Sequence, residues 1–348
     1  MVSGIAVLLT QLGTPDAPTT PDVRAYLREF LSDPWVVDMP RPLWLPLLHG
    51  VILRTRPARS AALYRQIWRP DGVSPLLHYT RTQNQAVAAT LPAGVGCTFA
   101  MRYGRPALTA ALHEIIAARV ERLLVFPLYP QYAAATTGST LSVVMDAMSA
   151  HRFQPALRVA APFYRRRSYI QALATRVQEA LTACRETEAD TPHILFSFHG
   201  LPQRHVDQGD PYAAQCQETA RLLAEELNLP REHWHLAFQS RFGRERWLSP
   251  ATTTLLARLP AEGVRSLLVV CPGFVADCLE TLEEINVQGR ALFFRAGGKA
   301  FHFVPCLNDH PAWIAALSAL VREELAGWVE EGSPATTDER PGAAGSHG

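Results

Sequence analysis

The sequence predicts an α/β protein with two similar lobes, each a four-stranded parallel sheet flanked by helices. Short apolar, β-branched runs alternate with segments of helical period, and this alternation occurs about four times in each half of the chain. Several of the apolar runs stop abruptly at a turn, as buried parallel strands do. A length of 348 residues suits two domains of ordinary size.

The composition indicates a globular protein with small-molecule partners. Apolar residues make up 48% of the chain and charged residues 19%, which allows a sizeable core. The net charge of +1 provides no basic field for nucleic acid. The six cysteines show no C-x-x-C pair and no short metal-ligand spacing, so we expect reduced thiols in a cytoplasmic protein.

The N-terminal apolar run lacks a basic n-region and is too short for a signal peptide. We therefore interpret it as the first strand, which ends near Leu12. No G-x-G-x-x-G follows this strand, which disfavours a dinucleotide site. The pattern predicts further strands near residues 97–101, 123–127 and 157–161, and helices near 22–31, 75–91, 105–119 and 138–150.

Residues 40–53, here called the lip, form an apolar stretch with three prolines. The stretch is too short to span a bilayer. A buried core helix is one interpretation, although Pro46 weakens it. The other is an apolar lip over a binding cleft, in contact with a membrane surface.

The second half repeats the plan, with strands expected near residues 193–198, 234–239, 266–271 and 302–305 and helices near 212–227 and 311–328. We therefore divide the chain into an N-terminal lobe, a C-terminal lobe, a C-terminal helix that packs back on the first lobe, and a disordered tail rich in Gly, Ser, Pro and Thr. These parts span residues 1–165, 166–308, 309–330 and 331–348.

A column of carboxylates follows the strand predicted at 266–271. Pro272 and Gly273 end that strand, and the residues after them have helical period. On an α-helix, Asp277, Glu280 and Glu284 fall at i, i+3 and i+7 on one face, where like charges repel weakly. The alternatives are a solvated acidic face and a site that receives a cation.

His199 lies where the strand predicted at 193–198 stops, within the motif S-F-H-G-L-P. Ligands of open parallel sheets bind beyond the carboxyl ends of the strands, so His199 and the carboxylate column face one crevice if their strands are neighbours. A single histidine with a structural role is the alternative.

Taken together, S-F-H-G-L-P (residues 197–202) and P-G-F-x-x-D-C-L-E-T-L-E-E-I (residues 272–285) resemble the ferrochelatases, which insert ferrous iron into a porphyrin. The resemblance runs from about residue 5 to residue 320. It also covers Y-P-Q-Y (129–132), T-T-G-S (136–139) and the stretch 238–243. It implies two Rossmann-like, chelatase-like lobes with a porphyrin cleft between them.

The resemblance assigns roles to residues of this sequence. It implies that His199 and Glu280 are the catalytic pair and the metal-binding residues, with Glu284 and Asp277 as proton or metal relays. A free-base porphyrin must lose two N–H protons, and aqueous Fe²⁺ must lose water. A neutral imidazole accepts protons and carboxylates displace water, so these residue types suit the task. The expected porphyrin-binding residues are Leu12, Leu43, Trp44, Leu45, Arg102, Tyr103, Tyr132 and Trp247.

Two of these expectations have reasons of their own. Arg102 and Tyr103 end a predicted strand, where they are suited to bind a carboxylate and stack on a ring, although surface and packing roles are equally open. The resemblance places Leu12 at a cleft position that holds tyrosine or methionine in some relatives. Leucine has no metal-binding atom, so the sequence favours iron entry along the carboxylate column.

The chain departs from the family pattern at two places. Cys278 stands where many animal members have histidine, which puts the role of that histidine in doubt here. Members with a 2Fe-2S cluster carry a cysteine beside T-T-G-S and others in a C-terminal extension. Residues 133–135 are alanines and no cysteine follows Cys306, so we expect no 2Fe-2S cluster and no tightly bound cofactor.

The predicted function is therefore the insertion of Fe²⁺ into protoporphyrin IX, with both molecules as substrates. Coproporphyrin III as substrate, and a haem carrier without catalysis, are the alternatives. We expect a cytoplasmic monomer or homodimer with peripheral membrane contact through the lip.

Overall fold

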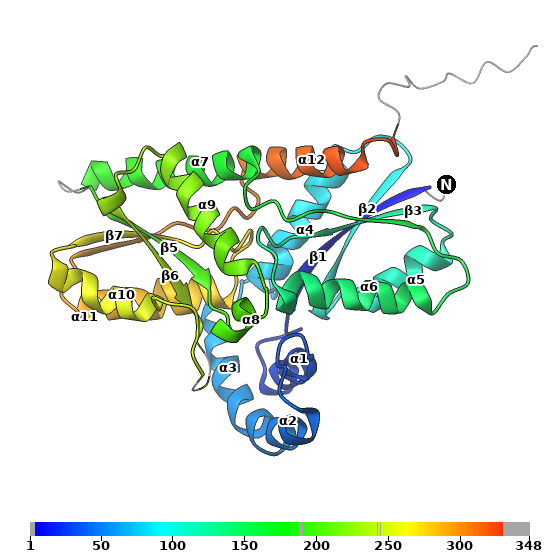
Figure 1. Cartoon of the computed structure of the whole chain (residues 1–348), viewed down its shortest axis with the longest axis horizontal. Helices are drawn as coiled ribbons and strands as arrows, with labels where there is room; N and C mark the ends of the chain where they lie inside the picture. Colours follow the sequence, from blue (N-terminus) through cyan, green and yellow to red (C-terminus); the bar gives the residue numbers. More distant parts are fainter. Residues whose placement is uncertain (1–3, 188–190, 242, 244, 330–348) are drawn as a thin grey trace, which may run out of the picture.

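Two parallel sheets lie side by side in the structure, which is a computed structural model describing residues 4–187, 191–241, 243 and 245–329 (Figure 1). The strand order is β2-β1-β3-β4 in the first sheet and β6-β5-β7-β8 in the second. Every pairing within them is parallel. The predicted pair of four-stranded parallel sheets is confirmed, and the shared strand order makes the lobes topological repeats.

The strand bounds lie within a few residues of those expected. The first sheet comprises β1 (Ile5–Thr14), β2 (Val95–Gly104), β3 (Arg122–Pro127) and β4 (Ala156–Val159). The second comprises β5 (His193–His199), β6 (Trp234–Gln239), β7 (Ser266–Val270) and β8 (Ala300–Phe303).

Helices cover both sheets and form an arm beneath them. The first lobe carries α4 (Pro75–Ala88), α5 (Leu108–Ala117), the π-helix η2 (Ala134–Gly138) and α6 (Ser139–Ser149). Along the second lie α7 (Arg167–Thr187), α8 (Gln203–Asp207), α9 (Tyr212–Glu226), the 3₁₀ turns η3 (Arg231–His233) and η4 (Leu259–Glu262), α10 (Thr252–Arg258), the π-helix η5 (Glu280–Gly289) and α11 (Arg290–Arg295).

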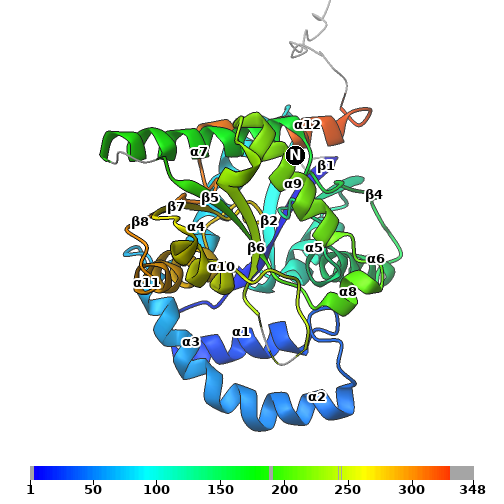
Figure 2. The ribbon, with the colours of Figure 1, turned by 60° about the vertical axis from the view of Figure 1, so that its left-hand side comes forward.

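The arm consists of α1 (Thr20–Ser32), α2 (Arg41–Leu47), the π-helix η1 (Leu48–Ile52) and α3 (Leu53–Ile67), and it projects from the two lobes (Figures 1 and 2). Its first helix begins where expected: Thr19 caps α1 by accepting a hydrogen bond from the Asp22 amide, and Pro21 occupies the first turn.

Residues 40–53 form a helical segment with buried and exposed apolar residues, whereas the cleft and the membrane contact stay predictions. Trp44 is 2% exposed and donates its indole N–H to the Leu31 carbonyl at 2.7 Å, so one face of α2 packs into the core of the arm. On the opposite face, Leu43 is 66% exposed. Leu47 and Val51 are exposed beside it.

The C-terminal helix α12 (Pro311–Leu325) contacts α7, and it also contacts α4 and β3 of the first lobe. The exact domain boundaries stay predictions, and the predicted tail at 331–348 lies outside the described residues. No helix among the described residues is both long enough and apolar enough to span a bilayer.

Three histidines meet at the start of β5 and β6. His193 Nδ1 lies 3.2 Å from His235 Nε2, and the His193 and His233 ring centroids are 5.0 Å apart. Burial, the charge of His193 and the nearby arginines Arg231 and Arg258 lower the pKa of His235 to about 4. The fold therefore favours the neutral form of this ring.

We predict that the protein loses stability as the pH falls from about 6.5 toward 4. In that window the unfolded chain binds a proton at His235 that the folded chain does not, so acid favours unfolding. In urea unfolding across this range, the free energy of unfolding of His235→Gln should fall less steeply with decreasing pH than that of the wild type. At pH 8, where the ring is neutral in both states, the two proteins should respond alike to pH; equal slopes at pH 4–6.5 would contradict the prediction.

Candidate active site

The acidic segment forms a π-helix, and it begins later than the sequence suggested. Helical structure starts at Leu279, and η5 carries Glu280 and Glu284. Asp277 precedes the helix, so the predicted α-helical column of three carboxylates is wrong. The periodicity that predicted it does not distinguish an α-helix from a π-helix, whose bonds run from i to i+5.

Asp277 is a buried anchor at the start of this helix. It exchanges two hydrogen bonds with Asn308: the Asn308 side-chain amide donates to its carboxylate at 2.6 Å, and its own N–H donates to Asn308 Oδ1 at 2.8 Å. The Thr281 hydroxyl also donates to this carboxylate, at 2.9 Å. Gln83 of α4 donates to the Asn308 carbonyl at 2.7 Å, which ties the anchor to the first lobe.

His199 ends β5, and β5 lies between β6 and β7. The predicted neighbourhood of the two strands is therefore confirmed. His199 Nδ1 is 2.7 Å from the Gly200 carbonyl oxygen. Because a carbonyl only accepts, this contact places the ring proton on Nδ1 and leaves the lone pair on Nε2. His199 thus presents a basic nitrogen with a fixed tautomer.

Glu284 is held by Ser240, the residue that follows β6. Its carboxylate accepts from the Ser240 amide at 2.7 Å and from the Ser240 hydroxyl at 2.5 Å. Burial raises the pKa of Glu284, whereas the Ser240 hydroxyl and the nearby His199 oppose that shift. His199 and Glu284 are therefore close enough to interact electrostatically.

Ser240 adopts an unusual backbone conformation to make these bonds. Its φ of +64° lies in the left-handed region, which side chains other than glycine seldom occupy. Strained residues of this kind concentrate at functional sites. Here the conformation directs both the amide and the hydroxyl of Ser240 at one carboxylate.

Gln239 joins the three elements of the site. Its backbone carbonyl accepts from the Gly200 amide at 2.7 Å, and its side-chain amide donates to the Glu280 carbonyl at 2.9 Å. The Ser197 hydroxyl donates to its Oε1 at 2.7 Å. Sequence reasoning gave no role to Gln239 or Ser240; the available signal was that Gln239 ends a predicted strand and Ser240 follows it.

Trp247 packs against the turn after His199. A Cβ added at Gly200 would lie 3.2 Å from Trp247 Cε3 and 2.7 Å from the Gln239 carbonyl oxygen, so only glycine fits there. The Trp247 indole nitrogen is buried and has no hydrogen-bond partner among the described residues.

Glu280 lies toward the arm, where α3 packs on η5. Burial raises the pKa of Tyr64 on α3 well above its usual value, and the charge of Glu280 adds to this effect. The structure thus brings His199, Glu280, Glu284 and Trp247 into one site, bordered by the arm.

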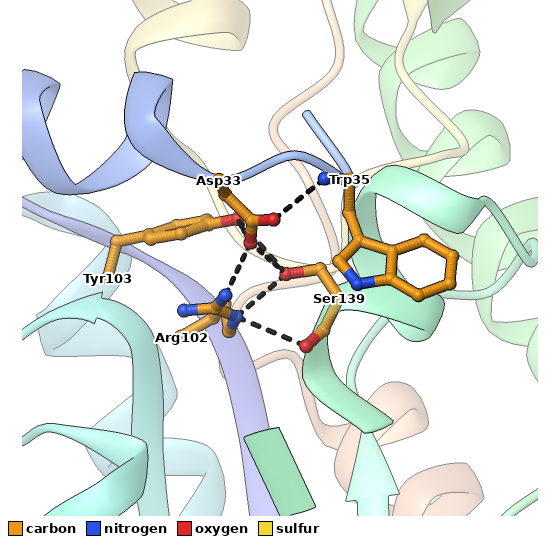
Figure 3. A network of polar contacts seen from close by, with 5 residues as sticks. All are labelled: Asp33, Trp35, Arg102, Tyr103 and Ser139. Atoms are coloured by element: carbon orange, nitrogen blue, oxygen red, sulfur yellow. Dashed lines mark hydrogen bonds and ion pairs between the residues drawn. The ribbon is translucent and has the colours of Figure 1, made fainter. Parts of the chain in front are cut away.

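Arg102 and Tyr103 were expected to bind porphyrin, but their side chains form a separate network with Asp33 (Figure 3). Arg102 forms an ion pair with the Asp33 carboxylate, which also accepts from the Tyr103 hydroxyl at 2.7 Å and the Ser139 hydroxyl at 2.6 Å. Tyr103 is fully buried. The carboxylate that Arg102 binds is therefore an internal one, which the sequence did not identify.

The remaining predicted porphyrin-binding residues occupy varied positions. Leu12 is half-buried near the end of β1, and the Tyr132 amide donates to Gln215 of α9 at 2.7 Å. Leu43 is exposed, Leu45 is half-buried and Trp44 is buried inside the arm. Trp44 therefore supports the lip from within.

A cavity of about 930 Å³ adjoins the Asp33 network, lined by α1, α6 and the segment after β2. Neither His199 nor the two glutamates line it. Within the part of the chain that the structure describes, no three His, Cys, Asp or Glu side chains are arranged to hold a metal ion.

Comparison with known proteins identifies the relatives of this chain. The family model described as ferrochelatase matches residues 4–325. A ferrochelatase of Azoarcus sp. strain BH72 is 50% identical over 341 residues, covering 97% of this chain and 92% of the relative. One of Nitrosococcus oceani is 48% identical over 332 residues, covering 94% and 89%.

Solved structures share the fold at low identity. The sirohydrochlorin chelatase SirB from Bacillus subtilis, solved with cobalt, has a TM-score of 0.54 at 12% identity and covers 92% of this chain and 94% of that one. The chelatase-like protein DR2241 from Deinococcus radiodurans has a TM-score of 0.53 at 12% identity and covers 92% of this chain and 55% of that one. The predicted chelatase-like fold is confirmed.

We predict that Asn308→Gly destabilises the protein by about 1–3 kcal/mol, the cost of removing partners from a buried carboxylate. Glycine accepts the φ of +48° at this position, so the loss reports the side chain. Asn228 has a similar φ of +52° and is exposed, which makes Asn228→Gly a matched control with little expected effect. Urea unfolding measures both; equal losses would contradict the anchor role.

Proposed function

The chain belongs to the ferrochelatase family and inserts ferrous iron into protoporphyrin IX, and we propose that His199, Glu280 and Glu284 carry this reaction. The observation that carries the proposal is the His199 tautomer fixed by the Gly200 carbonyl, which leaves Nε2 as the acceptor nitrogen, together with Glu284, which Ser240 holds and whose pKa is raised by burial and lowered by the charge of His199.

His199 acts as the base that removes pyrrole protons. The Gly200 carbonyl keeps the proton on Nδ1, so Nε2 is available without a change of tautomer. Two protons must leave the ring for each metal inserted. A base at a strand end, supported by the turn that Trp247 packs against, stays in place between the two transfers.

Glu280 and Glu284 deliver the metal and pass protons outward. Carboxylates replace the water molecules of Fe²⁺ and bind the ion without excluding its transfer to porphyrin nitrogens. Ser240 favours the ionised form of Glu284, against the effect of burial. Asp277, whose two carboxylate oxygens each accept a hydrogen bond from a buried neighbour, positions the helix and takes no direct part.

The enzyme works without an iron–sulfur cluster and without another tightly bound cofactor. Support comes from the alanines at 133–135 and from the six cysteines, five of which are buried. Iron is therefore a substrate, held only during the reaction.

The lip forms a peripheral membrane contact of a cytoplasmic enzyme. Leu43, Leu47 and Val51 are exposed apolar residues. Basic residues lie close to them on the arm: Arg24, Arg28, His49 and Arg54 are exposed and line one shallow pocket with Leu53. An apolar tip flanked by cationic side chains complements an anionic lipid surface. The contact does not require a dimer, so the lip acts equally in a monomer or a homodimer.

We predict that His199→Ala and the glutamate variants fail in different ways. Loss of the base should lower kcat by about 10²- to 10⁴-fold while porphyrin still binds. Glu280→Gln should raise the KM for Fe²⁺, and Glu280→Gln/Glu284→Gln should lose more than the product of the single effects, because each carboxylate covers part of the loss of the other.

Anaerobic haem formation followed by absorption gives kcat and both KM values, with porphyrin fluorescence as the check on binding. Wild-type kcat in His199→Ala would rule out its role as base. A glutamate double variant equal to the product of its singles would rule out the shared relay.

We also predict that the protein sediments with vesicles of anionic phospholipid at low salt, and that Leu43→Glu/Leu47→Glu abolishes this. Phe294 on α11 is 42% exposed, and Figures 1 and 2 place α11 away from α2, so Phe294→Glu serves as the control. Equal binding by the lip variant and the control would remove the lip from the contact.

A further inference from the structure

An ion pair connects the arm to the C-terminal lobe. Asp38 lies in the connection between α1 and α2, just before the lip, and Arg204 lies on α8. Both terminal nitrogens of the Arg204 guanidinium donate to the Asp38 carboxylate, one to each oxygen. The α1–α2 connection runs directly beneath α8 (Figure 2). In this two-point geometry the planar guanidinium matches both carboxylate oxygens, which orients Asp38 relative to α8.

The pair is supported on the side of the C-terminal lobe. Glu245 accepts from Arg204 Nε at 2.7 Å, which fixes the plane of the guanidinium. His205 Nε2 lies 3.4 Å from the same Asp38 carboxylate. The hydrogen bonds from Arg204 lower the pKa of Asp38, so the carboxylate is charged at neutral pH. Asp38 thus contacts two residues of the short helix α8, Arg204 and His205.

Helix α8 belongs to the wall of the active site. It follows the S-F-H-G-L-P motif directly, and the Gln203 amide donates to the Arg246 carbonyl at 2.9 Å. The Leu248 amide donates to the Leu201 carbonyl, also at 2.9 Å. These bonds unite α8 with the segment that carries Trp247. The ion pair therefore connects the root of the lip to the wall that bears His199.

The other polar anchors of the lip root lie within the first lobe and the arm. Asp33 binds Arg102, Tyr103 and Ser139, and Trp44 binds the Leu31 carbonyl. Those contacts are buried. In contrast, the Asp38 and Arg204 side chains are 34% and 40% exposed, so water can replace each of them at moderate cost.

We propose that Asp38 and Arg204 form a latch that holds the lip against the C-terminal lobe, and that this latch opens to admit porphyrin and to release haem. The inference rests on the proposed function, because it takes the space between the lip and His199 as the porphyrin cleft. An exposed pair contributes little free energy, so the latch sets the balance between closed and open forms without trapping either.

The latch predicts a specific kinetic pattern. Arg204→Met and Asp38→Asn should each speed haem release by about two- to fivefold, the range expected of an exposed ion pair. The KM for protoporphyrin should rise by a similar factor. The KM for Fe²⁺ and the rate of a single turnover with prebound porphyrin should stay unchanged, because neither residue touches the reacting groups.

The experiment measures haem transfer from the full-length enzyme to excess apomyoglobin in a stopped-flow instrument. This readout needs no turnover, so its result does not depend on the catalytic roles of His199 and the glutamates. The double variant Asp38→Asn/Arg204→Met tests whether both single effects arise from one pair: it should release haem no faster than the faster single variant. Arg221→Met removes another exposed arginine that is paired with two glutamates within α9, and it should release haem at the wild-type rate.

Faster release in both single variants, with no further increase in the double variant, supports the latch. Wild-type release in either single variant, with thermal unfolding unchanged, overturns it. Release from the double variant at the product of the two single effects also overturns it, because the effects would then not arise from the pair. Salt offers a second measurement: about 1 M NaCl should speed release from the wild type and leave Arg204→Met almost unaffected.

Discussion

The site depends on the way strand β6 ends beside strand β5. His199 pairs in register with Gln239, and the Gly200 amide continues the ladder by one bond to the Gln239 carbonyl. The Gln239 side chain donates a hydrogen bond to the backbone carbonyl of Glu280 on η5. Ser240, in a left-handed backbone conformation, donates hydrogen bonds to the Glu284 carboxylate. His199 on one strand and two glutamates on a separate helix are therefore fixed relative to each other by two consecutive residues. Because strand pairing is cooperative and buried, this arrangement is rigid before any substrate arrives.

The π-helix η5 is fixed at its start by a different set of contacts. The reciprocal bonds between Asp277 and Asn308, and the bond from Gln83 to the Asn308 carbonyl, connect the beginning of the acidic segment to α4 in the other lobe. The relative position of the two lobes is thus coupled to the position of Glu280. A carboxylate used in this way is costly unless every oxygen is satisfied, and the hydroxyl of Thr281 supplies a further bond.

The sequence predicted the sheets well because buried parallel strands leave a strong local signal. Residues 193–198 are an almost unbroken apolar run, and β5 is buried along its interior. The motif at His199 and the two glutamates was likewise recognisable. What the sequence did not reveal were partners distant along the chain. Asp33 binds Arg102 across 69 positions, and Asp277 binds Asn308 across 31. Nothing in the local pattern of a carboxylate shows whether it faces a substrate or a buried amide. The period of residues 275–285 also fits an α-helix, so the later start of η5 was not predictable from spacing.

Two aspartates at the root of the lip have opposite structural consequences. Asp33 is 6% exposed and binds three partners in the first lobe, so its network stays closed as a unit, since any partner removed leaves a buried charge unsatisfied. Asp38, five residues later, reaches the other lobe through a half-exposed pair that solvent can replace. The chain between them therefore has one end that is fixed and another that can be released. The difference between the two ends follows from burial. The Asp33–Arg102 pair is shielded from water and stays formed, whereas water can replace either partner of the exposed Asp38–Arg204 pair. The apolar lip begins at Pro40, two residues after Asp38. When the Asp38 pair opens, the lip moves with Asp38, while Asp33 stays bound to Arg102 of β2.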